Sequence, residues 1–289
     1  MARESLAWQS KLVLLAVLPF AGTGVLLACF GWAADSAAVL IWTVGLSGLL
    51  GLITWRLRAA TPGAAATGAI ITASLMFSTV EPPYEPWHTA LVPVLAVSML
   101  AFAATRAGRR KKERLGTAEA RRGRSAAQVA ANLGLAALVA SEPVRIWLSD
   151  SRWLPLHAHS PTLIPAMALA ALAEAAADTV SSEIGQVLGG RPRMITTLRP
   201  MAPGTDGAVS VLGTLAGVVA AAIVAAAGTW ALRGDWNLFT LSCAGALFGL
   251  IFDSLLGATL ERKGWLNNDA VNFLSTASAA AVALALLTF

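Results

Sequence analysis

The sequence predicts an all-α fold, a polytopic membrane helix bundle that forms a single domain over residues 1–289. Hydrophobic residues make up 56% of the chain and charged residues only 13%, and the mean hydropathy is +0.67. A soluble domain of this size needs a far more polar surface. The apolar residues also gather in runs of about 17–25 residues, the length that spans a bilayer. Charged residues, Pro and Trp separate these runs.

Nine apolar runs qualify as spans, so we expect about nine transmembrane helices. They cover residues 11–30, 37–55, 62–80, 87–105, 126–148, 161–179, 208–232, 238–260 and 270–288. The third, fifth and sixth runs are rich in Ala and contain polar residues, which weakens their apolar signal. The first run lacks a following small-x-small cleavage site, so we expect it to remain as an anchor.

The Lys and Arg residues predict a cytoplasmic N-terminus and an outer C-terminus. With nine spans in that orientation, all but three of the 21 basic residues face the cytoplasm. The exceptions are Arg145, Arg152 and Arg233. Cytoplasmic loops are typically basic, and an even span count would lose the bias. We therefore expect a multi-pass protein of the inner (plasma) membrane. Its net charge of +5 reflects loops facing anionic lipid, not nucleic acid.

Residues 106–124 form a strongly basic predicted cytoplasmic loop that includes Lys111. Such a loop can anchor the protein to the lipid surface. It can also clamp a polyphosphate, because fixed positive charge neutralises phosphate groups. The sequence leaves both interpretations open.

The sixth run ends in an acidic tract, residues 174–185, which carries the main functional signal. Ionisable residues inside a membrane are costly and mark sites for ligands, ions or protons. Glu174, Asp178 and Ser182 share a helix face, whereas Glu183 lies about 140° round from Asp178. These two carboxylates would therefore share an ion such as Mg²⁺ only if the helix ended or unwound near Ser182. The simpler alternative is a solvated helix end.

Residues 184–207 follow as a predicted cytoplasmic phosphate-binding loop that runs into the seventh span. Thr205 or Asp206 suits the N-cap of that span, and a helix N-terminus offers N–H groups to phosphate. Gly204 and Gly207 would let a phosphate approach the backbone closely. Positive charge beside the loop comes from Arg191, Arg193 and Arg199. The absence of a Walker A motif disfavours a P-loop ATPase.

Two further acidic residues are predicted to reach the same membrane face. Asp253 lies about two turns inside the eighth run, and Gly257, one turn further on, leaves room for a ligand beside it. Asp269 opens the ninth run with Asn268 and Asn272. An ion pair within the membrane for Asp253, and an N-cap for Asp269, are the simpler alternatives.

These segments resemble a known membrane family. Residues 177–185 (ADTVSSEIG), 203–210 (PGTDGAVS) and 253–259 (DSLLGAT) are similar to transmembrane-protein-19-like proteins, a family that includes the plant phytyl-phosphate kinase of tocopherol synthesis. Residues 111–119 and 128–132 fit the same pattern. The resemblance covers about residues 60 to 275, and Val180 stands where the family pattern leads us to expect Trp.

A weaker similarity extends to CTP-dependent phytol and dolichol kinases and to the cytidylyltransferases that make CDP-diacylglycerol. It implies CTP and Mg²⁺ at the cytoplasmic mouth. By this similarity, Asp178 and Glu183 would hold metal, and Gly204, Thr205 and Gly207 would line the phosphates. Asp253 and Asp269 would orient the metal or the attacking lipid phosphate. We therefore expect Asp178, Asp253 and Asp269 to be catalytic and Asp253 to be a third metal ligand. We also expect Lys111, Ser182, Arg199, Asn268 and Asn272 to bind the nucleotide.

The function we expect is a nucleotide-dependent kinase that converts an isoprenyl or phytyl monophosphate to the diphosphate. Both partners are polyanions, so the site has mainly to neutralise charge. A lipid cytidylyltransferase is one alternative, and a transporter or lipid flippase is the other. The polar elements cluster at one surface and no inverted repeat is visible, which disfavours the transporter. The expected partners are the isoprenoid lipid phosphate, the nucleotide and membrane lipids, with a homodimer left open.

Overall fold

The computed structural model describes residues 6–118, 122–151 and 160–288, and it confirms the all-α fold. Three residues of the basic set, Arg3, Arg121 and Arg152, lie outside the described ranges. A helix occupies each of the nine predicted runs. These helices are α2 (Ala7–Asp35), α3 (Ala37–Arg56), α4 (Pro62–Thr79), α5 (Leu91–Arg106), α7 (Ala126–Ala140), α9 (Leu163–Leu188), α10 (Val211–Ala231), α11 (Trp236–Leu256) and α12 (Asn268–Thr288).

Shorter elements join these helices. They are η1 (Pro86–His88), α6 (Arg109–Leu115), α8 (Glu142–Ser149), the π-helical turn η3 (Gly257–Glu261), and a small hairpin of β1 (Arg193–Met194) and β2 (Ala208–Val209). The two strands are antiparallel, with Arg193 opposite Val209.

By length and apolar composition, six described helices can cross a membrane: α2, α3, α9, α10, α11 and α12. The number rises to eight if the bent pairs α5–α6 and α7–α8 each count as one span. Helix α4, which is rich in Ala, Thr and Ser, is outside this set. The count of nine spans and the side of the N-terminus therefore stay predictions.

Several predicted element boundaries were wrong. The run 126–148 breaks after Ala140, and α8 is bent by 51° from α7, because Pro143 cannot continue the hydrogen bonding of α7. Helix α10 begins at Val211 behind Ser210, whose hydroxyl accepts from Gly213 N at 3.2 Å. The segment from 205 to 209 instead forms a turn and β2, so neither Thr205 nor Asp206 is the N-cap.

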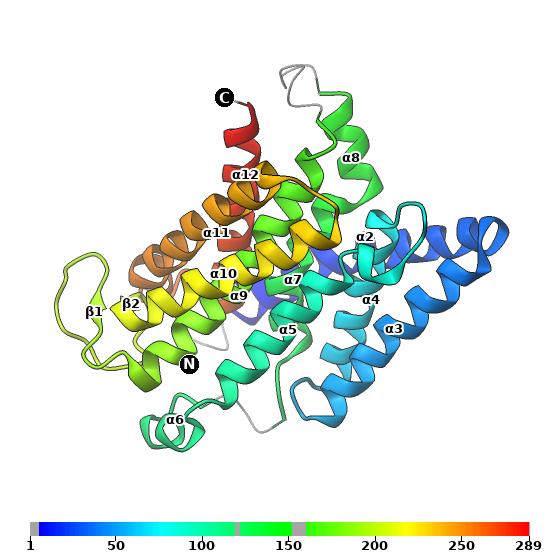
Figure 1. Cartoon of the computed structure of the whole chain (residues 1–289). Coiled ribbons are helices and arrows are strands. Elements are labelled where there is room, and N and C mark those ends of the chain that lie inside the picture. Colours follow the sequence, from blue (N-terminus) through cyan, green and yellow to red (C-terminus); the bar gives the residue numbers. More distant parts are fainter. Residues whose placement is uncertain (1–5, 119–121, 152–159, 289) are drawn as a thin grey trace.

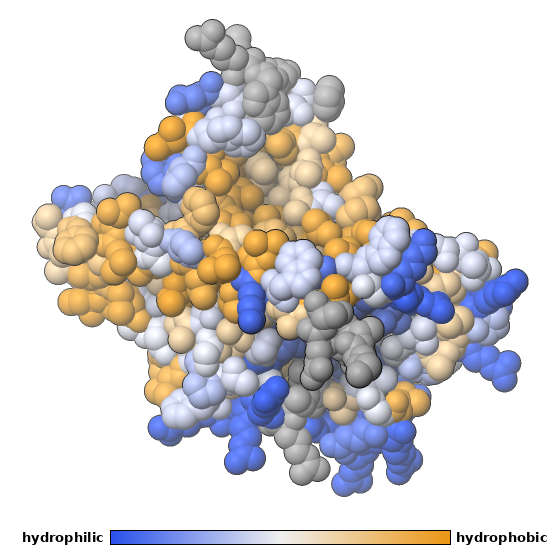
Figure 2. Space-filling view, turned by 180° about the vertical axis from the view of Figure 1, so that it is seen from behind, coloured by the Kyte–Doolittle hydropathy of each residue, from blue (hydrophilic) through white to orange (hydrophobic). Residues whose placement is uncertain are grey.

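The connections group at two ends of the molecule (Figure 1). Helix α6 and the β1–β2 hairpin lie at one end, whereas α8 and the last part of α12 lie at the other. At the first end, Arg106 donates to Leu57 O at 2.8 Å, and Arg262 contacts the sulfur of Met194. We call this the basic end. Figure 2 shows hydrophilic side chains along this end and a hydrophobic band above them.

Helix α9 forms the centre of the bundle and packs against α5, α7, α10, α11 and α12. In its most apolar stretch of 18 residues, 83% of the residues are buried, compared with 17% in the corresponding stretch of α2 and 22% in that of α3. Long apolar side chains of α2 and α3, such as Leu15, Phe30 and Ile41, are exposed. An apolar helix that is exposed in this way suits lipid as its surroundings. The buried polar residues of α9 are therefore enclosed by protein.

Candidate functional site

Helix α9 carries two of the predicted carboxylates one turn apart. Glu174 is 1% exposed, and Asp178 is half-buried. Gly249 of α11 lies against the side chain of Glu174, and a Cβ at this position would also meet the carbonyl oxygen of Ser275. Small residues let membrane helices approach closely. Glu174 is consequently enclosed between α9, α11 and α12.

Asp253, one turn after Gly249, brings a third carboxyl group into this interface. The carboxyl groups of Asp178 and Asp253 lie within hydrogen-bonding range of each other. The Ser275 hydroxyl on α12 lies near both Glu174 and Asp253 and donates to Asn272 O at 3.0 Å. Glu174, Asp178, Asp253 and Ser275 thus form one group from three helices, which we call the carboxylate cluster.

The chemistry of the cluster fits a divalent cation that also binds phosphate. Oε1 of Glu174 and Oδ2 of Asp253 are buried and have no hydrogen-bond partner among the described residues. Two carboxyl groups as close as those of Asp178 and Asp253 need a proton or a cation between them. Mg²⁺ commonly takes one or two carboxylates and completes its coordination with water and phosphate oxygens. Within the described ranges, no group of three or more His, Cys, Asp or Glu residues is placed to hold a metal ion, so a cation here would depend on the carboxylate pair and on phosphate.

Glu183 does not join Asp178, because α9 continues unbroken through Ser182 to Leu188. The helix break on which the shared site depended is absent. Glu183 Oε2 instead accepts from Lys112 Nζ at 2.5 Å. Lys112 is fully buried and also donates to Ala104 O at 2.7 Å. Glu183 therefore fastens α6 to α9, and of the three predicted metal ligands only Asp178 and Asp253 meet.

Arg124 is a basic residue beside the cluster, and its guanidinium interacts electrostatically with Asp178. Its backbone is held firmly: Arg124 N donates to Ala59 O at 2.9 Å, and Arg124 O accepts from Thr61 N at 3.0 Å. Gly123 makes this possible because it adopts φ +81°, and a Cβ there would collide with the backbone of Ala59 and Ala60, in the turn after α3. The backbone from which the Arg124 side chain extends is therefore held in place.

The sequence does not single out Arg124 among the charges of the 106–124 loop. One local signal marks its position. Ser125 and Gln128 form a capping box that starts α7 directly after Arg124. A basic residue just before a capped helix that packs on α9 is placed more firmly than a residue within a long loop.

The predicted phosphate loop packs against protein. Gly204 and Gly207 both have left-handed φ values, +83° and +73°. The space that a Cβ would fill is occupied by Thr117 at Gly204 and by Ala258 at Gly207. The missing side chains therefore make room for neighbouring protein, and the role of these glycines as phosphate ligands stays a prediction. They let the loop join the 106–124 segment to the end of α11.

Other predicted nucleotide-binding residues have contacts of their own. Lys111 Nζ donates to Val187 O at 2.6 Å and so covers the end of α9. Thr205 Oγ1 donates to Ala202 O at 2.8 Å within its turn. Ser182 and Arg199 are exposed at the basic end. As nucleotide ligands, all four remain predictions.

The predicted residues of α12 divide into two groups. Asn272, half-buried, lies three residues before Ser275 and so borders the carboxylate cluster along the helix. Asn268 is exposed. Asp269 Oδ2 accepts from Ser10 Oγ at 2.6 Å, which ties α12 to α2. The N-cap of α12 is not Asp269 but Asn267, whose side chain accepts from Ala270 N.

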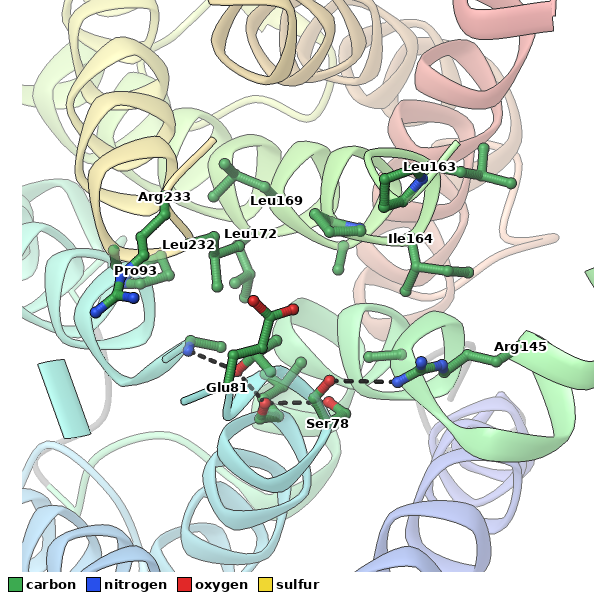
Figure 3. A pocket seen from close by; sticks show the side chains of 18 of the residues that line it. Ser78, Glu81, Pro93, Arg145, Leu163, Ile164, Leu169, Leu172, Leu232 and Arg233 are labelled. Atoms are coloured by element: carbon green, nitrogen blue, oxygen red, sulfur yellow. Dashed lines mark hydrogen bonds between the residues drawn. The ribbon is translucent and has the colours of Figure 1, made fainter. Parts of the chain in front are cut away.

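A cavity of about 440 Å³ lies at the end of the molecule opposite the basic end. Figure 3 shows Glu81 directed into this cavity, with Arg145 and Arg233 on either side and Leu169 and Leu172 above. Arg233 also donates to Glu85 at 3.3 Å, so its charge is partly neutralised. The cavity shares no described residue with the carboxylate cluster. Its lining is mostly apolar, with one carboxylate and two guanidinium groups that already contact other protein groups. It does not suit a polyphosphate.

Comparison with known proteins identifies the family. A model of the family described as integral membrane protein DUF92 matches residues 45–280. The chain belongs to this family. The DUF92 match includes the whole carboxylate cluster and Arg124, and it leaves α2 outside. It also establishes the chain as an integral multi-pass membrane protein.

Several curated proteins are similar to this DUF92 chain. An uncharacterized membrane protein of Methanocaldococcus jannaschii is 44% identical over 108 residues, which is 37% of this chain and 45% of the relative. An uncharacterized membrane protein of Synechocystis is 34% identical over 206 residues, 68% of this chain and 73% of the relative. The chloroplastic protein VTE6 of Arabidopsis thaliana is 33% identical over 115 residues, 39% of this chain and 34% of VTE6. No solved structure matches.

Proposed function

We propose that this chain is a membrane-embedded kinase that phosphorylates an isoprenyl or phytyl monophosphate with a nucleoside triphosphate, CTP by family resemblance. The observation that carries the proposal is the carboxylate pair Asp178–Asp253, which is enclosed between helices and in which Asp178 interacts electrostatically with Arg124. The similarity to VTE6, a phytyl-phosphate kinase, supports the substrate class.

The reaction is a transfer between two phosphates. An oxygen of the lipid monophosphate attacks the γ-phosphorus of the nucleotide, and the bond from that phosphorus to the β–γ bridging oxygen breaks. The products are the lipid diphosphate and the nucleoside diphosphate. The attacking phosphate oxygen is already ionised, so a strong general base is unnecessary. Catalysis then consists mainly of positioning and neutralising charge.

The residues of the chain divide this work. Asp178 and Asp253 would hold Mg²⁺, which would supply positive charge to offset that of the phosphates. Arg124 would stabilise the phosphoryl group in transfer, as fixed guanidinium groups do in other phosphotransferases. Glu174 and Ser275 position the pair from within the bundle. The nucleotide would enter from solution at the basic end, where residues such as Ser182 and Arg199 are exposed.

Purified protein with labelled CTP or ATP, Mg²⁺ and a panel of phytyl, geranylgeranyl and undecaprenyl phosphates tests the proposal. We expect a lipid diphosphate and a nucleoside diphosphate. Asp178→Asn should lower the rate by about a hundredfold or more while the melting profile in detergent is retained. Asp206→Asn, which removes an exposed acid from the same end, serves as the matched control and should keep its rate.

The products separate the alternatives. A CDP-lipid with pyrophosphate would replace the kinase by a cytidylyltransferase, since the α-phosphorus is then attacked. No turnover with any nucleotide, together with substrate-driven proton flux in vesicles, would replace it by a transporter. A wild-type rate in Asp178→Asn would remove the carboxylate pair from the mechanism.

A further inference from the structure

A second cavity, of about 140 Å³, lies at the basic end between α3, α4, α5, α7 and α9. Its mouth is lined by four arginines: Arg58, Arg106, Arg109 and Arg124. Its interior is small and mainly apolar. The walls include Ala64, Ala65, Gly68, Val94 and Val97, together with the polar side chains of Thr72, Ser98 and Asn132. We call it the arginine-rimmed cavity. Of the residues that line it, the proposed function uses only Arg124.

The mouth carries an excess of positive charge. No Asp or Glu occurs among the described residues that line it. Arg109 is partly neutralised by Glu113 at 3.1 Å, and Arg106 donates to Leu57 O and lies 4.2 Å from the Phe102 ring centroid. The side chains of Arg58 and Arg124 have no hydrogen-bond partner among the described residues. Guanidinium groups bind phosphate through paired, charge-assisted hydrogen bonds.

The cavity and the carboxylate cluster lie next to each other. Ala175, on the inner wall, precedes Asp178 by three residues, about 4.5 Å along the axis at 1.5 Å per residue. Arg124 belongs to both places, since it lines the cavity mouth and interacts with Asp178. A phosphate bound at this mouth would therefore lie beside the carboxylate pair.

We propose that the arginine-rimmed cavity is the subsite for the lipid monophosphate, which rests on the proposed function. The phosphate binds Arg58, Arg106 and Arg124, and the first carbons of the lipid chain occupy the apolar interior. The rest of the chain passes out along α3, whose Leu49, Leu52 and Ile53 are exposed. The acceptor then enters from the membrane and the nucleotide from solution, on either side of Asp178.

Photolabelling locates the lipid directly. The probe is a phytyl monophosphate with a diazirine near the phosphate, bound to purified protein in nanodiscs without nucleotide and mapped by peptide mass spectrometry. We expect the label on α4, α5 or α7. An excess of unlabelled phytyl phosphate should remove it, whereas inorganic phosphate or phosphatidylglycerol at the same concentration should not.

Substitutions test the two halves of the cavity separately. Arg58→Gln should weaken phytyl-phosphate binding about tenfold, the loss of one charge-assisted hydrogen bond, with nucleotide binding unchanged. Arg56→Gln removes the same charge from the adjoining turn without lining the cavity, and it should bind normally. Ala101→Phe fills the interior and should block the label. Ala103→Phe, on the exposed side of α5, should not.

The results separate the failure of the subsite from that of the function. Lipid diphosphate formation with the label on α10 or α11, or equal binding by Arg58→Gln and Arg56→Gln, would overturn the subsite and leave the kinase in place. Competition by inorganic phosphate as strong as that by phytyl phosphate would show an anion site without a lipid chain. No labelling by lipid phosphate and no turnover would remove both proposals.

Discussion

Lys112 illustrates at the residue scale how this protein handles buried charge. It comes from a basic segment whose other residues are largely exposed, yet its side chain is 1% exposed. Its ammonium group donates to Glu183 and to the carbonyls of Ala104 and Thr105. All three ammonium protons have an acceptor. This satisfaction is what permits a lysine to be fully buried.

Lys112→Met is expected to destabilise the protein by about 3–5 kcal/mol, since it leaves Glu183 largely buried without its partner. Replacing both residues, as in Lys112→Met with Glu183→Leu, should recover much of that loss because no charge is then buried alone. Thermal unfolding in detergent measures both. Arg110→Met, on an exposed position of α6, is the control. Equal melting of the single and double variants would contradict a buried ion pair.

The role of a residue could be predicted from the sequence where the free-energy cost of burying its charge requires a partner. A carboxylate in an apolar run, such as Asp178 or Asp253, needs a partner, and the structure brings these two together. Glu183 stands near the end of the same helix, where Lys112 from a distant loop could reach it. That pairing depends on the position of α6, which no local pattern reveals. Arg124 was missed for the same reason.

At the scale of elements, small residues determine how closely α11 and α12 approach α9. Gly249, Ala170 and Ala279 lie where the three helices cross. No larger side chain fits at Gly249, because Glu174 and the Ser275 carbonyl fill the space where a Cβ would be. The carboxylate cluster therefore depends on one missing methyl group.

Gly249→Ala is expected to lower stability by about 1–3 kcal/mol through overpacking and to reduce turnover by separating Glu174 from Ser275. Gly48→Ala is the matched control, since a Cβ at Gly48 meets nothing within 4 Å. Melting temperature and lipid diphosphate formation are measured for both. A Gly249→Ala protein as stable and active as Gly48→Ala would show that the helices have room to move apart.

Helix positions could be read from hydropathy, but several helix ends could not. Every predicted run contains a helix because only a helix satisfies its own backbone within lipid. The ends depend on competing local contacts. The segment before Val211 pairs as β2 with β1 instead of extending α10, and Pro143 divides the fifth run. Gly204 and Gly207 of the 184–207 loop have left-handed backbones, as their residue type suggests, but packing fills the space beside them.

The whole molecule separates its charges between two ends. Contacts join the turn after α3 to the loop before α7, and the loop after α9 to the end of α11. At the other end, Arg233 after α10 contacts Glu85 before α5, and Arg145 of α8 contacts Ser78 O of α4. Successive connections between helices therefore lie at alternate ends, as nine antiparallel crossings would produce. Within this arrangement, the carboxylate cluster lies nearer the basic end. Hydropathy alone supports six to eight spans, because α4 relies on burial against α3 and α7.

The orientation is testable by cysteine labelling, because positive charge favours the cytoplasmic side. Cys29 and Cys243 are first replaced by Ala. A single cysteine is then placed at an exposed site of each end, as Lys263→Cys at the basic end and Glu142→Cys at the other. In intact cells, a membrane-impermeant maleimide should label only the Glu142→Cys protein, and Lys263→Cys should react only after lysis. The reverse pattern would place the carboxylate cluster near the outer face, where no cytoplasmic nucleotide could reach it. Labelling of both from outside would require an even number of crossings between the two sites.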